Sequence, residues 1–551
     1  MSEGGFVMND LSKIFADIKD GATVTLESGK VYDVRPEDSY NLTGYFCSNT
    51  AKLHENPLGT KFAAIYLKDK KNIVIDGRGA AVIVHGKMTP MIFDNCENVT
   101  VRNIAFDYAC PTMTEFTVLS EDGESVVIRI NSDCLFRVEN NELIWHGEEK
   151  SDGGFYWENK SSERGRYVKV LNPKTRHTKD FRREDLEFER IECIDENTLR
   201  LFPKNKGVRF GTGNVFQTRN IVRDQTGSMF QRCRNLCFED LRIMFMHGLG
   251  MVSQFCENVT YRNCDLTPKE GRTIASTADF FQFSGCRGKL KIENCKAWGA
   301  QDDYVNVHGT HLRIVEKDDS GKTVVVRFMH SESWGFQAFE VGDELEFIRW
   351  DTLIPYGKTS VLSYEKLNDT DIKLSLTEGV PESAVIGKDV VENVTWTPDL
   401  HVVGCDFGHT SGRGILCTTR GEVIIENNRF ESLWGPALLI EDDCNFWFES
   451  GYTKEILFRN NIVTGCEFGK TWETAPVIRY SPKVMNEESQ EYVHGRLVVS
   501  GNTFEKAVYG THSFRLEYLA EAEITDNRFD APFAVNTKCV GKVTYTANIV
   551  G

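Results

Sequence analysis

The stretch Asn258-Val-Thr-Tyr-Arg-Asn263-Cys264 carries a phrase that recurs along the chain. Alternating apolar residues lead to an asparagine or aspartate, and a second short apolar stretch follows it. The spacing between copies is irregular but clusters at roughly 20 to 35 residues, a period typical of stacked repeats. Further copies begin at Asn98, Asn235, Leu290, Val423, Glu455, Arg496, Glu523 and Val543.

This phrase predicts a parallel β-helix. Alternation turns the Val, Ile and Phe side chains of each short strand to one face. The asparagine marks the bend between two strands, where its side chain bonds its own backbone and tolerates a left-handed conformation. We therefore predict an all-β fold, a right-handed parallel β-helix whose coils pair with the coils above and below. A leucine-rich repeat would show an LxxLxL spacing, which is missing, and a sandwich would not repeat the same bend residue so often.

Two strand-rich stretches interrupt the repeat, and we predict that each forms a small antiparallel β-barrel inserted at a corner of a coil. Both are too long and too rich in strands to be loops. The predicted organisation is an N-terminal helix and first coils in residues 1–111, an inserted barrel in 112–214, coils that carry the catalytic aspartates in 215–311, a second inserted barrel in 312–393 and C-terminal coils in 394–551.

The composition limits the partners. Among 551 residues, 64 Lys and Arg face 81 Asp and Glu, a net charge of −17. This charge argues against a nucleic-acid partner, which needs clustered basic residues, and more weakly against a polyanionic polysaccharide. The sequence contains no apolar run of about 18 residues, so we expect no membrane partner. The sequence leaves a homodimer open.

The N-terminus and the cysteines bear on location. The first residues lack the basic-then-apolar pattern of a signal peptide, so we expect a cytoplasmic protein, or a secreted or periplasmic one if a signal has been removed. Many of the sixteen cysteines recur at one place in the repeat, which favours reduced thiols stacked in a core. Zinc-type spacings are missing, and we expect neither a metal nor another cofactor.

Three aspartates make the strongest catalytic pattern. Asp279 lies about one coil before Gln301-Asp302-Asp303, so their backbones should lie roughly 4.8 Å apart on neighbouring rungs. When carboxylates lie so near to one another, their mutual repulsion raises the pKa of at least one of them. One carboxyl can then donate a proton at neutral pH while another accepts one, as glycoside hydrolysis requires.

One constraint applies to this pattern. Asp302 and Asp303 point to opposite faces in a regular strand, so both reach one cleft only if the chain bends, and Gly299 favours such a bend. The alternatives are a solvated turn pair and a pair of calcium ligands. Asp279 and the nearby His308 favour the catalytic interpretation.

A β-helix with an Asp and then Gln-Asp-Asp one coil later resembles the polygalacturonase-type glycoside hydrolases. The whole chain resembles more closely glycoside hydrolase family 110, the exo-acting α-1,3-galactosidases. The residues that carry this resemblance are Ala278-Asp279, Gln301-Asp302-Asp303 and Trp447-Phe-Glu449-Ser-Gly, together with the two insertions.

The resemblance implies an activity. Family 110 enzymes remove terminal α-1,3-linked galactose from glycans such as the blood group B antigen or linear Galα1,3Gal, with inversion and without a metal. It implies that Asp302 is the general acid and that Asp279 and Asp303 activate the water. An inverting pair should lie about 6.5–9.5 Å apart, whereas a separation near 5 Å would instead suggest retention.

A polygalacturonase-like enzyme, another β-helix glycosidase or lyase, and a non-catalytic glycan-binding protein are the alternatives. Polygalacturonases bind the substrate carboxylate with Arg-Ile-Lys, whereas this chain has Leu312-Arg313-Ile314-Val315. Together with the acidic net charge, this difference favours a neutral sugar.

Further residues are predicted to bind the substrate. Arg413 stands between two glycines and can fork two hydroxyls, although it is equally suited to cap backbone carbonyls. A tryptophan can stack on the apolar side of galactose and carboxylates can accept its hydroxyls, although Trp447 also suits a core. The full set of predicted binding residues is His308, Arg413, Arg272, Glu270, Glu441, Trp447, Glu449 and Trp298.

Overall fold

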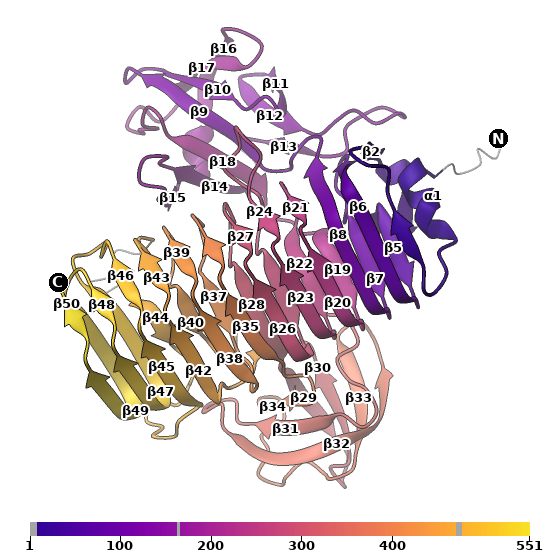
Figure 1. The fold of residues 1–551 in the computed structure, drawn as a ribbon, viewed down its shortest axis with the longest axis vertical. Helices are drawn as coiled ribbons and strands as arrows, with labels where there is room; N and C mark the ends of the chain where they lie inside the picture. Colours follow the sequence, from indigo (N-terminus) through magenta and orange to yellow (C-terminus); the bar gives the residue numbers. More distant parts are fainter. Residues whose placement is uncertain (1–7, 162–165, 470–475) are drawn as a thin grey trace.

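The computed structural model describes residues 8–161, 166–469 and 476–551. Figure 1 shows the chain as a stack of parallel coils with two insertions, which confirms the predicted parallel β-helix. Each complete coil runs over three parallel faces, and equivalent strands of neighbouring coils pair along the stack. No helix in the described ranges is both long and apolar enough to cross a membrane.

The first face carries the strands that follow Asp279, Asp303 and Arg413 in the sequence. Its short strands bury Val, Ile and Phe on the inside, for example Phe281, Val305 and Ile415 on three successive coils. The strands are β5 (Ile65–Lys68), β7 (Met91–Asp94), β19 (Thr226–Gln231), β22 (Leu249–Gln254), β25 (Phe281–Ser284), β28 (Val305–Thr310), β37 (Ile415–Cys417), β40 (Leu438–Ile440) and β44 (Pro476–Tyr480).

The other two faces close each coil. The second face contains β20 (Arg234–Glu239), β23 (Glu257–Arg262), β26 (Arg287–Glu293), β35 (Asp399–Val403), β38 (Glu422–Glu426), β42 (Glu455–Arg459) and β45 (His494–Ser500). The third contains β21 (Arg242–Ile243), β24 (Asp265–Leu266), β27 (Lys296–Ala297), β36 (Asp406–Phe407), β39 (Arg429–Glu431), β43 (Ile462–Thr464), β46 (Thr503–Glu505), β48 (Arg528–Phe529) and β50 (Ile549–Val550). Long strands span two faces: β6 (Lys71–Val84), β8 (Glu97–Tyr108), β47 (His512–Thr525) and β49 (Phe533–Thr546).

The repeated asparagine stands at the bend between the second and third faces. Asn103, Asn263, Asn294, Asn427 and Asn460 all have φ between 53° and 58°, a left-handed conformation that asparagine tolerates better than most residues. After the bend the side chains stack inside the coil. The amides of Asn428, Asn461, Asn502, Asn527 and Asn548 form one hydrogen-bonded column, with Nδ2 to Oδ1 distances of 3.0–3.1 Å.

Cysteines form columns of the same kind. One column, after the bend between the second and third faces, continues the asparagine column towards the N-terminus with Cys264, Cys295 and Cys405. A second column, at the bend between the first and second faces, contains Cys96, Cys233, Cys256 and Cys286. All sixteen cysteines are free thiols. The expected stack of reduced cysteines in the core is therefore confirmed.

The N-terminal segment covers the first coil. Helix α1 (Asp10–Ala16) begins at Asn9, whose Oδ1 accepts the N–H of Ser12 at 2.8 Å, and it buries Leu11 and Phe15 in the main core. The rest of this segment contains β1 (Thr23–Thr25), β2 (Val31–Val34), a 3-10 helix (Pro36–Asp38), β3 (Tyr40–Leu42) and β4 (Lys61–Ala63).

The first insertion differs from the predicted barrel. Its strands form a seven-stranded antiparallel sheet and a separate three-stranded sheet, and within the described residues they do not close into one ring. One core that contains Phe116, Trp145 and Phe216 joins the two sheets. Its last strand reaches Asn220, beyond the predicted boundary at 214, because that strand pairs with the first strand of the insertion.

The elements of the first insertion are β9 (Thr114–Glu121), β10 (Val126–Ile130), β11 (Leu135–Glu139), β12 (Glu142–His146), β13 (Glu158–Lys160), β14 (Arg166–Leu171), β15 (Thr178–Asp180), a 3-10 helix (Arg183–Leu186), β16 (Phe188–Cys193), β17 (Thr198–Pro203) and β18 (Val215–Asn220).

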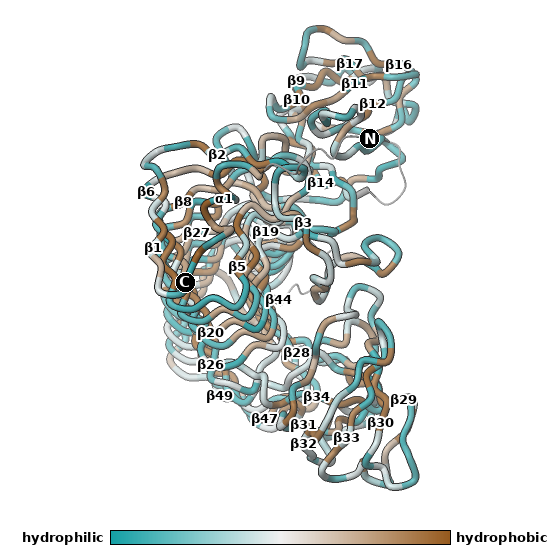
Figure 2. Tube along the Cα trace, turned by 90° about the vertical axis from the view of Figure 1, so that its right-hand side faces the viewer, coloured by the Kyte–Doolittle hydropathy of each residue, from teal (hydrophilic) through white to brown (hydrophobic). Residues whose placement is uncertain are grey.

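The second insertion is a closed six-stranded barrel. Its strands are β29 (Leu312–Lys317), β30 (Thr323–Arg327), β31 (Glu344–Ile348), β32 (Pro355–Lys366), β33 (Asp371–Leu376) and β34 (Val390–Asn393). In Figure 2 the coils lie one behind another, and both insertions project to the same side of the stack. A short strand of a later loop, β41 (Glu449–Ser450), pairs with the end of β28 beside this barrel.

Candidate active site

Asp279, Asp303 and Arg413 occupy the same position on three successive coils. Each lies two residues before a paired residue of β25, β28 or β37, since Phe281, Val305 and Ile415 are in register. The backbone N–H of Asp303 donates to Asp279 Oδ1 at 3.2 Å, and that of Arg413 donates to Asp303 Oδ1 at 3.2 Å. The strand register therefore stacks two carboxyl groups and a guanidinium group at one corner of the β-helix.

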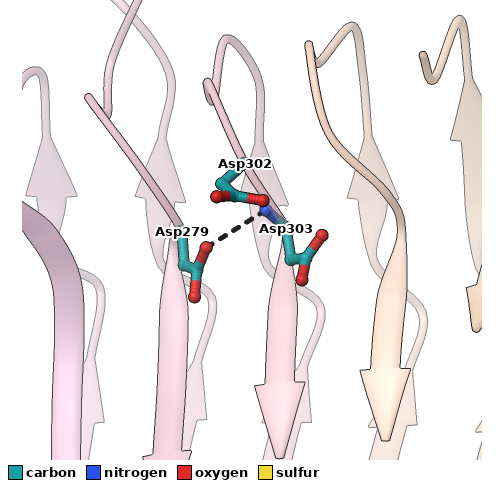
Figure 3. Close-up of side chains that lie close together, drawn as sticks. All are labelled: Asp279, Asp302 and Asp303. Atoms are coloured by element: carbon teal, nitrogen blue, oxygen red, sulfur yellow. Dashed lines mark hydrogen bonds between the residues drawn. The ribbon is translucent and has the colours of Figure 1, made fainter. Parts of the chain in front are cut away.

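Asp302 joins this group because the chain bends before β28. Gly299 has φ +79°, and a Cβ there would lie 2.4 Å from the carbonyl oxygen of Thr273. Thr410 Oγ1 holds the turn by donating to the Asp302 carbonyl at 2.7 Å. One oxygen from each of the three aspartates lies within 4.8 Å of the others, as Figure 3 shows. The predicted convergence of the three carboxylates is thus present.

The three carboxylates differ in exposure and pairing. The Asp303 side chain is 0% exposed and receives two bonds from Arg413, from Nε at 2.5 Å and from Nη2 at 2.7 Å. Asp302 is 38% exposed, and Arg413 Nη2 reaches it only at 3.4 Å. Asp279 is buried, and no cation lies within ion-pair distance of it among the described residues.

Burial raises the pKa of Asp279 well above its usual value, and the charges of Asp302 and Asp303 raise it further. Burial also raises the pKa of Asp303, an effect that Arg413 opposes and Asp302 reinforces. A cluster of this kind retains a proton near neutral pH. The site can therefore both donate and accept a proton.

The spacing differs from one prediction. The closest oxygens of the three aspartates lie nearer together than the 6.5–9.5 Å expected for an inverting pair. Oxygens this close are also of the kind that bind a divalent cation, but Arg413 already pairs with Asp303 and reaches Asp302.

A cavity opens in front of the aspartates. Four of the predicted binding residues line it: Arg413, Glu441, Trp447 and Glu449. Trp447 is 42% exposed, and its ring packs against His330 of the second insertion at 4.2 Å between centroids, tilted by 31°. Burial tends to raise the pKa of Glu441, but the ammonium of Lys483 at 2.8 Å outweighs it and lowers this pKa.

His308 lies behind the cavity wall. It is buried, with Nδ1 2.7 Å from the carbonyl oxygen of Gly309 and Nε2 2.7 Å from Gln282 Nε2. Its Nε2 lies 3.9 Å from Glu449 Oε1. These contacts support the wall and do not place the ring in the cavity.

Three predicted binding residues do not line this cavity. Arg272 is buried in ion pairs with Asp107 at 2.6 Å and Asp133 at 2.7 Å, and Glu270 is an exposed residue of the same turn. Trp298 follows β27 on the third face, where the cations of Arg176 and Lys296 cover its ring. Proximity in sequence to the aspartates did not bring these side chains to the first face.

The sequence did not reveal four other residues of the cavity lining. These are Asn49, Arg223, Asn306 and Leu416. Asn49 and Arg223 belong to loops far from any catalytic motif. Only Asn306, a polar residue within the alternating strand after Asp303, left a signal in the pattern.

Asn49 closes one end of the cavity. Its Nδ2 donates to Glu449 Oε1 at 2.6 Å, and its Oδ1 accepts Ser333 Oγ of the second insertion at 2.9 Å. The first insertion contacts the residue before Asp302, since Arg219 Nε donates to Gln301 Oε1 at 2.9 Å. Both insertions thus contact residues at or next to the cavity lining.

Known proteins were compared with this chain. It is 34% identical to "Alpha-1,3-galactosidase A" of Akkermansia muciniphila over 88% of this chain and 77% of that protein. The chain belongs to the α-1,3-galactosidase family, glycoside hydrolase family 110.

Other members of family 110 give the same result. The chain is 32% identical to "Alpha-1,3-galactosidase A" of Bacteroides thetaiotaomicron over 84% of this chain and 78% of that protein. It is 31% identical to "Alpha-1,3-galactosidase B" of the same organism over 88% and 77%, respectively. A family model described as GLAA-B beta-barrel domain II matches residues 323–391, within the second insertion.

Proposed function

We propose that this chain is an exo-acting glycosidase that hydrolyses terminal α-1,3-linked galactose from glycans. The observation that carries the proposal is similarity over most of the chain to proteins named α-1,3-galactosidase A and B. Asp279, Asp302 and Arg413 line a cavity with Asp303 buried beside them, and these residues supply the groups that hydrolysis requires. The second insertion packs against residues that line this cavity, with His330 against Trp447 and Ser333 bonded to Asn49.

In the proposed reaction Asp302 protonates the glycosidic oxygen. Of the three carboxyls it is the most open to the cavity. The proton comes from the cluster, in which burial and mutual repulsion keep one carboxyl protonated. A remaining carboxylate of Asp279 or Asp303 accepts the proton of the attacking water.

We propose inversion of the anomeric carbon. A covalent intermediate requires a carboxylate oxygen that can reach this carbon. Asp303 is fully buried and held by two bonds from Arg413, and Asp279 is also buried. A water activated by Asp279, which lines the cavity beside Asp303, is therefore a better nucleophile than either carboxylate, even though the trio is closely spaced.

Proton NMR tests the substrate and the stereochemistry together. We expect Galα1,3Gal and the blood group B trisaccharide to release galactose whose first anomeric signal is that of the β-anomer. The α-anomer first would contradict inversion. Release of galacturonic acid from polygalacturonate without any release of galactose would contradict the function itself.

Two further measurements separate catalysis from binding. Asp302→Asn keeps the side-chain volume and should lose nearly all turnover on a disaccharide, whereas it should retain more activity on an aryl galactoside whose leaving group needs no proton. A protein that only binds glycans would show no turnover to lose. Full activity in the presence of a chelator is expected, and loss of activity would favour a metal-dependent lyase.

A further inference from the structure

Asn306 is a polar side chain on the floor of the catalytic cavity that no described residue fully satisfies. It is buried and lines the cavity with the aspartates, yet its Oδ1 has no hydrogen-bond partner among the described residues. On β28 its neighbours Val305 and Val307 point into the core, so Asn306 points outward to the cavity face. A buried amide oxygen without a partner costs free energy, which a bound ligand would recover.

The position of Asn306 relative to the aspartates fits one side of a sugar ring. It follows Asp303 by three residues, so the two lie at most roughly 10 Å apart along the chain, at about 3.3 Å per extended residue. In a pyranose the C4 carbon lies across the ring from the anomeric carbon. Asp279, Asp302 and Asn306 line the same cavity, so a ring with its anomeric carbon at the aspartates can direct its C4 hydroxyl towards Asn306.

The surroundings make Asn306 the amide that faces the ligand. Gln282, its partner in register on β25, also has an unsatisfied Oε1, but its Nε2 is held against His308 Nε2 at 2.7 Å and it does not line the cavity. On the other side, Leu416 of β37 is in register with Asn306 and lines the cavity. An apolar side chain beside an amide suits a sugar, which presents both C–H groups and hydroxyls.

We propose that Asn306 is a specificity-determining residue whose side-chain amide hydrogen-bonds the C4 hydroxyl of the terminal galactose. This inference rests on the proposed function. A hydroxyl both donates and accepts, so it matches either end of the amide. The axial C4 hydroxyl is what distinguishes galactose from glucose, and a buried amide at this place would reject a sugar that lacks it.

The test compares substrates as well as variants. Replacing the C4 hydroxyl of Galα1,3Gal by hydrogen should lower kcat/KM of the wild type about 10- to 100-fold. Asn306→Leu keeps a similar side-chain size without polar atoms. Its kcat/KM on the parent disaccharide should fall by the same factor, and its kcat/KM on the 4-deoxy analogue should equal that of the wild type. The proposal would be overturned if the losses caused by Asn306→Leu and by removal of the C4 hydroxyl were fully additive. It would also be overturned if Asn306→Leu showed the same non-additivity with a 3-deoxy analogue.

Gln282→Leu provides the matched control on the neighbouring coil. Its effect should be the same on the parent and the 4-deoxy substrate, because Gln282 does not face the cavity. Asn306→Ser shortens the side chain beyond reach and should show the same coupling as Asn306→Leu, so the test does not depend on one variant folding.

Binding separates this inference from the proposed function. Failure of the wild type to release galactose would contradict the function. In Asp302→Asn protein, calorimetric titration should show that galactose binds about 10- to 100-fold more tightly than 4-deoxygalactose, and that adding Asn306→Leu removes this difference. Equal affinity for the two sugars in the Asp302→Asn protein would overturn the role of Asn306 without reference to turnover.

Discussion

At the scale of the residue, the active site uses the geometry that builds the core. The register that places Phe281, Val305 and Ile415 one above another inside the helix also places Asp279, Asp303 and Arg413 one above another at its corner. Gly412 completes this arrangement, because a Cβ there would lie 2.3 Å from the backbone of Asp302. The coil spacing thus fixes the distances between catalytic groups before any side chain adjusts.

Arg413→Ala should show how far one cation controls the buried acids. Without the two bonds from Arg413, the pKa of Asp303 rises further, since burial is then opposed less. The acidic limb of the kcat/KM profile should therefore move to higher pH, and the maximal rate should fall about 100-fold or more. Rate measurements on an aryl galactoside between pH 4 and 9 check this.

Arg429→Ala is the control for that variant. Arg429 lies on the third face, half exposed, where it pairs with Glu431. Its removal should leave both limbs of the profile in place. If Arg413→Ala gave a profile of wild-type shape, its ion pair would not set the protonation of the trio.

The site could be predicted only where its residues follow the repeat. The three aspartates and Arg413 were found because the coil length relates their positions in sequence to positions in space. Asn49 and Arg223 were missed because they enter through loops whose course depends on packing against the insertions. Arg272 and Trp298 were misplaced because the turn before Asp279 and the third face lead away from the cavity.

At the scale of the element, the bends of the helix use asparagine in two distinct ways. Residues such as Asn235 supply a left-handed backbone at the surface, with φ 56° and an amide that bonds Asn98 at 2.9 Å. Residues such as Asn502 follow a bend and are buried. The Asn502 side chain accepts the N–H of Asn461 at 2.8 Å and donates to the Phe458 carbonyl at 2.9 Å.

These two uses predict different stabilities. Asn502→Ala leaves a buried N–H and a buried carbonyl without partners and should lower the free energy of unfolding by about 2–5 kcal/mol. Asn235→Gly keeps the left-handed bend and removes only an exposed amide, so the loss should stay near 0.5 kcal/mol. Denaturant titration of the two variants measures the contrast, and equal losses would show that the buried column has no special role.

At the scale of the whole molecule, the β-helix supplies the aspartates and Arg413, and the second insertion packs against residues that line the cavity in front of them. The helix could be predicted because each coil depends on a short, local pattern. The insertions could be predicted only as regions, since the first forms an open sheet rather than a barrel and extends to Asn220. Strand pairings between distant residues leave no fixed period in a sequence.

Buried carboxyls also link the docking of these parts to pH. Glu115 of the first insertion is buried against the turn before the catalytic corner, where its carboxylate accepts the N–H of Thr273 at 3.0 Å. Burial raises its pKa to about 7, although the bonds from Thr273 oppose the shift. Burial likewise raises the pKa of Asp442 to about 7, against the opposing charge of His311.

The stability of the protein should therefore fall as the pH rises. Between about pH 4.5 and 7 the folded chain keeps protons on Glu115 and Asp442 that the unfolded chain has released, so the unfolding free energy decreases with pH in this window, by up to about 3 kcal/mol for Glu115. Thermal unfolding should give a Tm that declines through this range. Glu115→Gln and Asp442→Asn should each flatten the decline, whereas Glu189→Gln, at an exposed position, should leave it unchanged. A wild-type Tm that rises from pH 5 to 7 would mean that other groups dominate this window, and equal slopes in all four proteins would show that the two buried carboxyls do not hold these protons.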